Sequence, residues 1–192
     1  KGVPKMSPTL LSKRLKELEW HGILKRVASP MGSRKSEYVL TQAGIELFDV
    51  INAIGSWGKR WIDMRHNLDS AKENLLIWDI RRNLRMEYFP IDSAVLQINI
   101  TDVPKKTSNW WFIFDGKERP DVGYLDPSLD VDLYIETSLS SLTKVWLGES
   151  PLATESKAGT LQIEGSQKMI ETFESWFGVN NFAAIPKFSI AS

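Results

Sequence analysis

The spacing of the apolar residues changes partway along this chain, and this change restricts the possible folds more than any other feature. In residues 8–21, 41–64 and 67–84 apolar side chains mostly recur three or four positions apart, as along one face of an amphipathic helix. After Pro90 they alternate in four short runs typical of β-strands, AVLQINIT, NWWFIFDG, RPDVGYLD and VDLYIETS. The sequence therefore predicts an α+β chain with a helical first part and a mainly antiparallel sheet in the second.

The first helix is defined at both ends. Ser7 precedes a proline, a pair typical of a helix start, because serine caps free N–H groups and proline at the first position loses no hydrogen bond. Gly22 is a natural stop, so we predict a helix over residues 8–21. Its apolar face is a narrow leucine seam: Leu11, Leu15 and Leu18.

A β-hairpin and a long helix are predicted to follow. ILKRVASP and EYVLT are β-prone runs that flank the basic loop MGSRKS. Thr41 can cap a second helix that extends to about Met64. Its apolar positions keep helical spacing: Leu47, Val50, Ile51, Ile54, Trp57 and Trp61. Helix, basic hairpin and helix, in this order, form the later part of a winged helix-turn-helix.

Charge is unevenly distributed along the chain. Residues 1–66 contain twelve Lys or Arg and six Asp or Glu, a net charge of +6, and because the whole chain is neutral the remainder carries −6. A basic excess can mark a phosphate-binding surface, although on its own it is more often a solvated face. Charge alone therefore does not decide between these interpretations.

GVPKMSPTLLSKRLKELEWHGILKR and EYVLTQAGIELFDVINAIGSWGKRW resemble HxlR-type bacterial transcriptional regulators, over about residues 2–62. The resemblance implies a recognition helix in the major groove, a hairpin wing and a closing helix that helps to form a homodimer. The two helices that precede the recognition helix in that family are not in this sequence, so we expect the leucine seam to need a partner surface. With the hairpin, the resemblance favours double-stranded DNA as the partner, bound by Ser7, Thr9, Ser12, Lys13, Arg14, Lys16, Arg34 and Lys35.

The second part resembles a sterol carrier protein-like domain from DPSLDVD to GVNNFA, and more weakly back to Leu84. This resemblance implies an α+β fold, with an antiparallel sheet and helices around an apolar cavity that binds a lipid or another hydrophobic small molecule. We expect helices at SLSSLTKVWLG, PLATESKAG and SQKMIETFESWFG, with TLQIEG as a strand. The predicted domains are 1–64, a winged helix-turn-helix; 65–83, a helical connector; and 84–192, the carrier-like domain.

Eight tryptophans are many for this length. Any single one more often fills a core than contacts a ligand, but together they favour a cavity lined by large apolar side chains. In NWWFIF, alternation places Trp111 and Ile113 on the face opposite to Trp110, Phe112 and Phe114. The candidate ligand-binding residues are Trp111, Trp146, Leu147, Met169, Phe173 and Trp176.

Catalysis finds little support in the sequence. The absence of cysteine excludes disulfides, thiolate chemistry and cysteine-ligated metals, and fits a reducing cytoplasm. His21 and His66 are the only histidines, and no motif surrounds either. No Gly-rich phosphate loop, HExxH or GxSxG is present, and no apolar run approaches the length of a membrane span. We predict no catalytic residue, no metal site and no cofactor.

These patterns predict a cytoplasmic transcriptional regulator in which a ligand of the second domain changes DNA affinity through the connector around residues 65–82. Two alternatives stay open at this point. One is a lipid-binding or lipid-transfer protein whose basic segment contacts membranes. The other is a regulator whose second domain has a filled core and serves only as a dimerisation scaffold.

Overall fold

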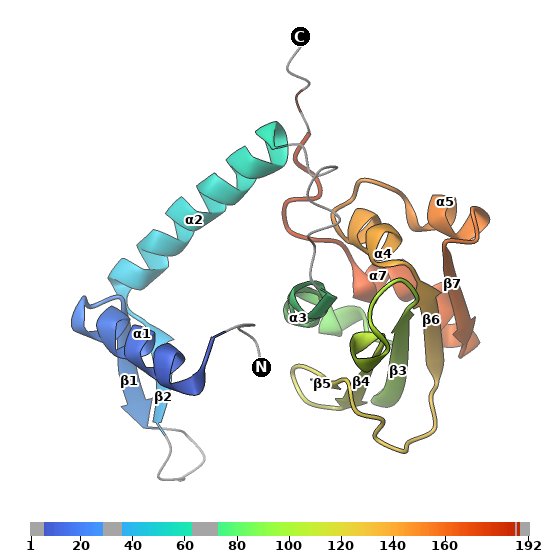
Figure 1. The fold of residues 1–192 in the computed structure, drawn as a ribbon, viewed down its shortest axis with the longest axis horizontal. Coiled ribbons are helices and arrows are strands. Elements are labelled where there is room, and N and C mark those ends of the chain that lie inside the picture. The colour runs from blue at the N-terminus through green and yellow to red at the C-terminus, as the bar shows by residue number, and fades with distance from the viewer. Residues whose placement is uncertain (1–5, 29–35, 63–72, 187, 189–192) are drawn as a thin grey trace. The chain divides into compact units, whose positions relative to one another are not determined.

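Figure 1 shows the computed structural model of the chain, which describes residues 6–28, 36–62, 73–186 and 188. The chain forms two compact units. Of the described residues, those up to 62 and residue 188 belong to the first unit, and residues 73–186 belong to the second.

The first unit contains a helix, a two-stranded hairpin and a long helix, in the order that the sequence predicts. Strands β1 and β2 pair antiparallel, from Leu24 opposite Leu40 to Ala28 opposite Ser36. The basic tip of the hairpin lies outside the described residues. The elements are α1 (Pro8–Trp20), β1 (Leu24–Ala28), β2 (Ser36–Leu40) and α2 (Gln42–Trp61).

The predicted caps form at both helix starts. Ser7 Oγ accepts a hydrogen bond from the Leu10 N–H at 3.1 Å, and Thr41 Oγ1 accepts one from the Gly44 N–H at 3.2 Å. Gly22 takes a φ of +69°, the left-handed conformation that ends α1. The Thr41 hydroxyl also donates to the Gly22 carbonyl, so the first turn of α2 is fastened to the end of α1.

The first unit leaves much apolar surface uncovered. On the predicted leucine seam, Leu11 and Leu18 are exposed and Leu15 is only half-buried. Helix α2 buries only Gly44 and Lys59. Its exposed apolar side chains, called here the α2 apolar surface, are Ile45, Leu47, Phe48, Val50, Ile51, Ile54, Trp57 and Trp61. Exposed apolar surface of this extent is typical of interaction sites.

The second unit is built on a five-stranded sheet in the order β5-β4-β3-β6-β7 (Figure 1). Neighbouring strands are antiparallel except β3 and β6, which run parallel with Leu96 opposite Leu133. The prediction of a mainly antiparallel sheet is confirmed. The strands are β3 (Ser93–Ile100), β4 (Asn109–Asp115), β5 (Asp121–Gly123), β6 (Leu133–Thr137) and β7 (Leu161–Gly165).

The predicted closing helix is wrong in one respect, because it consists of two short helices. Thr172 separates them with a φ of −102°, and its hydroxyl donates to the Lys168 carbonyl at 2.8 Å, in competition with the helical pattern. The helices of the second unit are α3 (Glu73–Asn83), α4 (Leu139–Trp146), α5 (Leu152–Lys157), α6 (Gln167–Glu171) and α7 (Phe173–Phe177), with 3₁₀ turns at Met86–Tyr88 and Lys105–Thr107.

One hydrophobic core fills the space between the sheet and these helices. Trp110, Phe112 and Phe114 belong to it, whereas Trp111 and Ile113 do not, as the alternation predicts. Aromatic rings pack closely inside it: Phe173 stacks on Phe177 with ring centroids 4.6 Å apart. Helix α3 joins the same core and therefore packs within the second unit, through Leu76, Ile77 and Ile80.

Candidate nucleic-acid interface and apolar cleft

One face of α1 gathers several of the predicted DNA-binding side chains. An α-helix turns by about 100° per residue, so Thr9, Lys13 and Lys16 lie within an arc of about 60°, and Ser12 lies beside them. All four are exposed. We call the residues Thr9, Ser12, Lys13 and Lys16 the α1 lysine face. Neither lysine forms a salt bridge with a carboxylate in the described part of the chain, so both ammonium groups can meet a phosphate.

Ser7 and Arg14 lie differently from these residues. The Ser7 hydroxyl oxygen is occupied by the cap of α1. Arg14 lies about 140° around the helix from Thr9, and its guanidinium contacts Glu17 Oε2 at 2.7 Å. That contact lowers the pKa of the Glu17 carboxyl below its usual value. The structure therefore does not bring Arg14 together with the α1 lysine face.

The hairpin carries a basic side chain that the sequence analysis did not single out. The Arg26 guanidinium donates to Ser36 Oγ at 2.6 and 3.1 Å, and it lies 5.7 Å from the centre of the Tyr38 ring. These contacts hold Arg26 on the strand that leads to the wing tip. Strand register, which pairs Arg26 with Tyr38, is the signal that would have found it. The predicted wing residues Arg34 and Lys35 lie outside the described residues.

Trp20 is a second residue that the sequence analysis missed. It ends α1 only about 20° around the helix from Thr9, so it extends the α1 lysine face. Its side chain is 82% exposed and meets the His21 ring edge-on, with centroids 4.7 Å apart. The helical spacing of residues 9, 13, 16 and 20 would have shown its position, but not its exposure.

The six predicted ligand-binding residues do not form one lining. Trp146, Met169, Phe173 and Trp176 are buried in the core, and Leu147 packs against it. Trp111 stands on the opposite face of the sheet, because neighbouring residues of a strand point to opposite sides. Of the six, Phe173 is the residue that lines the cleft between α4 and α7.

That cleft has a volume of about 290 Å³, near the lower limit for a small-molecule site. It lies between the turn that joins α4 to α5 and the end of α7. Its walls are mainly apolar, with the Ser150 hydroxyl and the Glu174 carboxylate as polar groups. We call it the α4–α7 cleft, and its lining is Val145, Gly148, Ser150, Pro151, Leu152, Phe173, Glu174, Phe177, Gly178 and Val179.

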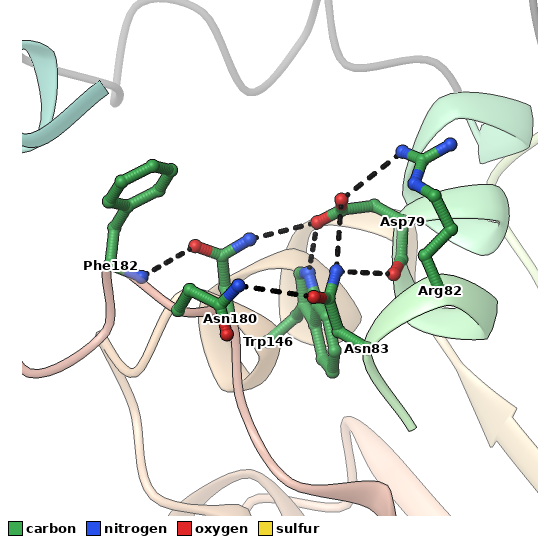
Figure 2. Close-up of polar contacts among 7 residues, drawn as sticks. Asp79, Arg82, Asn83, Trp146, Asn180 and Phe182 are labelled. Carbon is green, nitrogen blue, oxygen red and sulfur yellow. Dashed lines mark hydrogen bonds and ion pairs between the residues drawn. The ribbon is translucent and has the colours of Figure 1, made fainter. Parts of the chain in front are cut away.

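A carboxylate holds the segment after α7 in place beside this cleft (Figure 2). Asp79 Oδ2 accepts hydrogen bonds from Trp146 Nε1 and Asn180 Nδ2, both at 2.8 Å. Asp79 Oδ1 accepts from Asn83 and Arg82 at 3.3 Å. One aspartate thus links α3, α4 and the segment that begins at Gly178 and Val179 in the cleft wall.

Glu155 fastens the other side of the cleft. The residue is 9% exposed, and its carboxylate accepts a hydrogen bond from Thr160 Oγ1 at 2.7 Å. Hydrogen bonds from Ser150 and then Thr160 hold the pKa of the Glu155 carboxyl below its ordinary value. Ser150, which lines the cleft, is thus held by the Glu155 carboxyl.

The described ranges contain neither a helix that could span a membrane nor a cluster of metal-binding side chains. No helix there is both long enough and apolar enough to cross a membrane. No three His, Cys, Asp or Glu side chains there gather as metal ligands.

The first unit is similar in sequence to known helix-turn-helix proteins. Residues 1–66 match the HxlR-like helix-turn-helix family. A curated relative is YvaP of Bacillus subtilis strain 168, an uncharacterised HTH-type transcriptional regulator, with 41% identity over 61 residues, 32% of this chain and 56% of that protein. Another such regulator, from Methanothermobacter thermautotrophicus, shares 31% identity over 65 residues, 34% of this chain and 50% of its own. The chain thus spans about half the length of these relatives.

Solved structures similar to part of the chain include UbiJ-SCP2, a ubiquinone synthesis protein, with a TM-score of 0.40 and 18% identity over 55% of this chain and 88% of that one. Sterol Carrier Protein 2 from Yarrowia lipolytica, in its apo form, has a TM-score of 0.39 and 18% identity over 53% of this chain and 92% of its own. The family match shows that the first third of this chain carries an HxlR-like helix-turn-helix sequence, and a larger α+β unit follows it.

Proposed function

We propose that this protein is a DNA-binding transcriptional regulator whose second unit binds a small hydrophobic molecule. The observation that carries the proposal is the α1 lysine face, where two exposed lysines lie on one side of a helix that a β-hairpin follows. The family match over residues 1–66 supports the same assignment. Such a regulator works in the cytoplasm of a bacterium or archaeon.

In this proposal α1 enters the major groove and the hairpin reaches the adjacent backbone. Lys13 and Lys16 contact phosphates, and Thr9 and Ser12 are short enough for close approach to the duplex. Arg26 supplements the predicted wing residues Arg34 and Lys35 from the strand beside the tip. Most of the affinity then comes from release of counterions, so binding weakens steeply as salt rises.

A second copy of the chain is the proposed cover for the α2 apolar surface. Exposed side chains of this size are unfavourable in water. A symmetric pair of α2 helices would bury those that share an arc of about 120° on one side of the helix, which are Leu47, Val50, Ile51, Ile54, Trp57 and Trp61. A dimer also presents two α1 helices to two half-sites of an operator.

The α4–α7 cleft is the proposed ligand site, and Phe173 is the predicted ligand-binding residue that lines it. Its apolar walls favour a lipid-like or aromatic molecule, and its volume favours a small one or one end of a longer chain. A ligand can change DNA affinity only if it binds the DNA-competent and incompetent states unequally. The segment after α7 is held by the hydrogen bond from Asn180 to Asp79. It lines the cleft through Gly178 and Val179, and the chain then continues to residues of the first unit.

The chain after α7 is therefore a second covalent link between the two units, in addition to the connector around residues 65–82, and the proposed coupling can use either. Of that connector, only α3 falls within the described residues. At the end of the segment after α7, the Phe188 ring stacks on Trp61 with centroids 5.5 Å apart, and the Phe188 N–H donates to the Arg60 carbonyl at 3.1 Å. Both contacts lie within the first unit.

The test is fluorescence anisotropy of the protein with duplex DNA from its own promoter, repeated with a pyrene-labelled fatty acid present. The proposal expects salt-sensitive duplex binding and a change in duplex affinity at saturating fatty acid. Saturating fatty acid with no change in affinity would exclude ligand sensing by this class of molecule.

A scaffold role for the second unit is the competing version, and the filled core favours it. Trp146 and Trp176 are almost completely buried among other side chains, and the cleft beside them is small. Native mass spectrometry without a co-purified small molecule, together with unaltered duplex binding, would support this version. A lipid-transfer protein would instead sediment with vesicles and show no duplex binding.

A further inference from the structure

We propose that Trp20 is a DNA-contact residue of α1, whose indole packs against the sugar-phosphate backbone beside the lysines and adds affinity that does not depend on salt. This inference rests on the proposed DNA-binding function. It adds a residue and a type of contact that charge and resemblance did not indicate.

The position of Trp20 is fixed by helix geometry. Thr9, Lys13, Lys16 and Trp20 follow one another at spacings of four, three and four, within an arc of about 60°. Lys13 and Trp20 are seven residues apart, which is about 10 Å along the helix axis and close to the length of three nucleotides of one strand. A duplex that lies along the α1 lysine face therefore reaches Trp20 as well.

The exposure of Trp20 has no explanation in the packing of the first unit. Among the large apolar side chains that the structure describes, it has the largest exposed fraction, 82%. Tryptophan is usually well covered in folded proteins. Leu11 and Leu18 lie on the opposite side of α1, about 180° to 200° from Thr9. Trp20 therefore belongs to the polar side of the helix and not to its leucine seam.

The chemistry of an indole fits a nucleic-acid backbone flanked by lysines. Its ring offers a flat apolar surface for deoxyribose, and its N–H can donate to a phosphate oxygen. The neighbouring ammonium groups of Lys13 and Lys16 attract the same strand by charge, which gives a basic surface with an aromatic end. Because the indole is neutral, its contact releases no counterion, and this separates its contribution from that of the lysines.

The experiment measures Kd for promoter duplex by anisotropy over a series of KCl concentrations, with the full chain and four variants. Trp20→Ala is expected to weaken binding by about ten-fold at every salt concentration and leave the slope of log K against log salt unchanged. Trp20→Phe is expected to retain most of the affinity. Lys16→Ala should reduce the magnitude of the slope by about 0.9 for each α1 bound. Leu125→Ala, which trims another highly exposed apolar side chain, is the matched control and should bind as the parent does.

The outcomes separate the two proposals. If the parent protein binds no duplex at low salt, the proposed DNA-binding function and the proposed role of Trp20 are both overturned. If the parent binds and Trp20→Ala binds equally well, only the role of Trp20 is overturned. If Trp20→Ala loses affinity together with its oligomeric state in sedimentation velocity, or with its thermal unfolding transition, the indole is a protein-packing residue and the inference is also overturned.

Discussion

At the scale of single residues, the structure shows how polar side chains position the apolar elements around the α4–α7 cleft. Asp79 is the clearest example, because one carboxylate accepts from an indole of α4 and from an amide beyond α7. Sequence predicted Trp146 as a ligand contact, but it could not show that the indole N–H is engaged by Asp79. A partner sixty-seven residues away leaves no local pattern.

Replacing Asp79 with alanine leaves the Trp146 indole N–H and an Asn180 amide N–H without their acceptor. Unsatisfied partly buried donors cost about 1 to 3 kcal/mol, so the free energy of unfolding of the second unit should fall by that amount. Urea denaturation followed by tryptophan fluorescence measures it. Asp130→Ala, at an exposed loop position, is the control and should change stability little. Equal stability of both variants would show that the Asp79 contacts are not structural.

The lowered pKa of Glu155 predicts how the stability of the protein depends on pH. The folded state lowers the pKa of this carboxyl, so its stabilising contribution is present above the pKa of the unfolded chain, about 4.3, and is lost as pH falls through the folded value. The stability advantage of the parent over Glu155→Gln should therefore be largest near neutral pH and shrink below about pH 4. Thermal melts from pH 7 to pH 3 test this, and an advantage that grows on acidification would contradict it.

At the scale of elements, most of the fold could be predicted because helix starts, glycine stops and strand alternation are local signals. The caps at Ser7 and Thr41, and the opposite faces of Trp110 and Trp111, follow directly from the sequence. The break between α6 and α7 could not, since the apolar spacing continues through Thr172. Which core residues border a cleft also depends on packing between distant elements, so local spacing could not show that Phe173 borders the α4–α7 cleft while the other five predicted residues do not.

Two glycines of α2 provide a matched pair of predictions. A Cβ at Gly44 would clash with the Ile23 carbonyl and approach Leu40 Cδ2 to 2.9 Å, so Gly44→Ala should destabilise the first unit by about 1 to 3 kcal/mol. A Cβ at Gly58 would meet only Ile62 Cδ1 at an ordinary 3.6 Å, so Gly58→Ala should stabilise α2 by about 0.5 to 1 kcal/mol. Circular dichroism melts of both variants measure the difference, and the same sign for both would contradict this packing.

At the scale of the whole molecule, the chain passes between its units twice, once before α3 and once after the segment held by Asp79. The first unit buries little apolar surface and the second contains the core, so the proposed dimer would stabilise the first unit more than the second. The sequence indicated this dependence through the leucine seam, but the full extent of the α2 apolar surface emerged only from the structure.

A charge placed in the α2 apolar surface should prevent the proposed dimer. Ile51→Glu is expected to shift the protein to monomer in sedimentation velocity and to weaken duplex binding, because two half-sites are no longer bound together. Leu125→Glu, which places the same charge at an exposed position of the second unit, should leave the dimer intact. A dimer that persists in Ile51→Glu would mean that another surface holds the two copies together.

The central claim is that the α1 lysine face binds the phosphates of a duplex. Its most direct measurement is the salt dependence of promoter binding by the parent protein and by the Lys13→Ala, Lys16→Ala double variant. The account predicts a steep linear decrease of log K with log salt, whose slope is smaller in the double variant by about 1.8 for each α1 bound. Unchanged slope and affinity in the double variant, or a parent protein that does not bind duplex even at low salt, would contradict it.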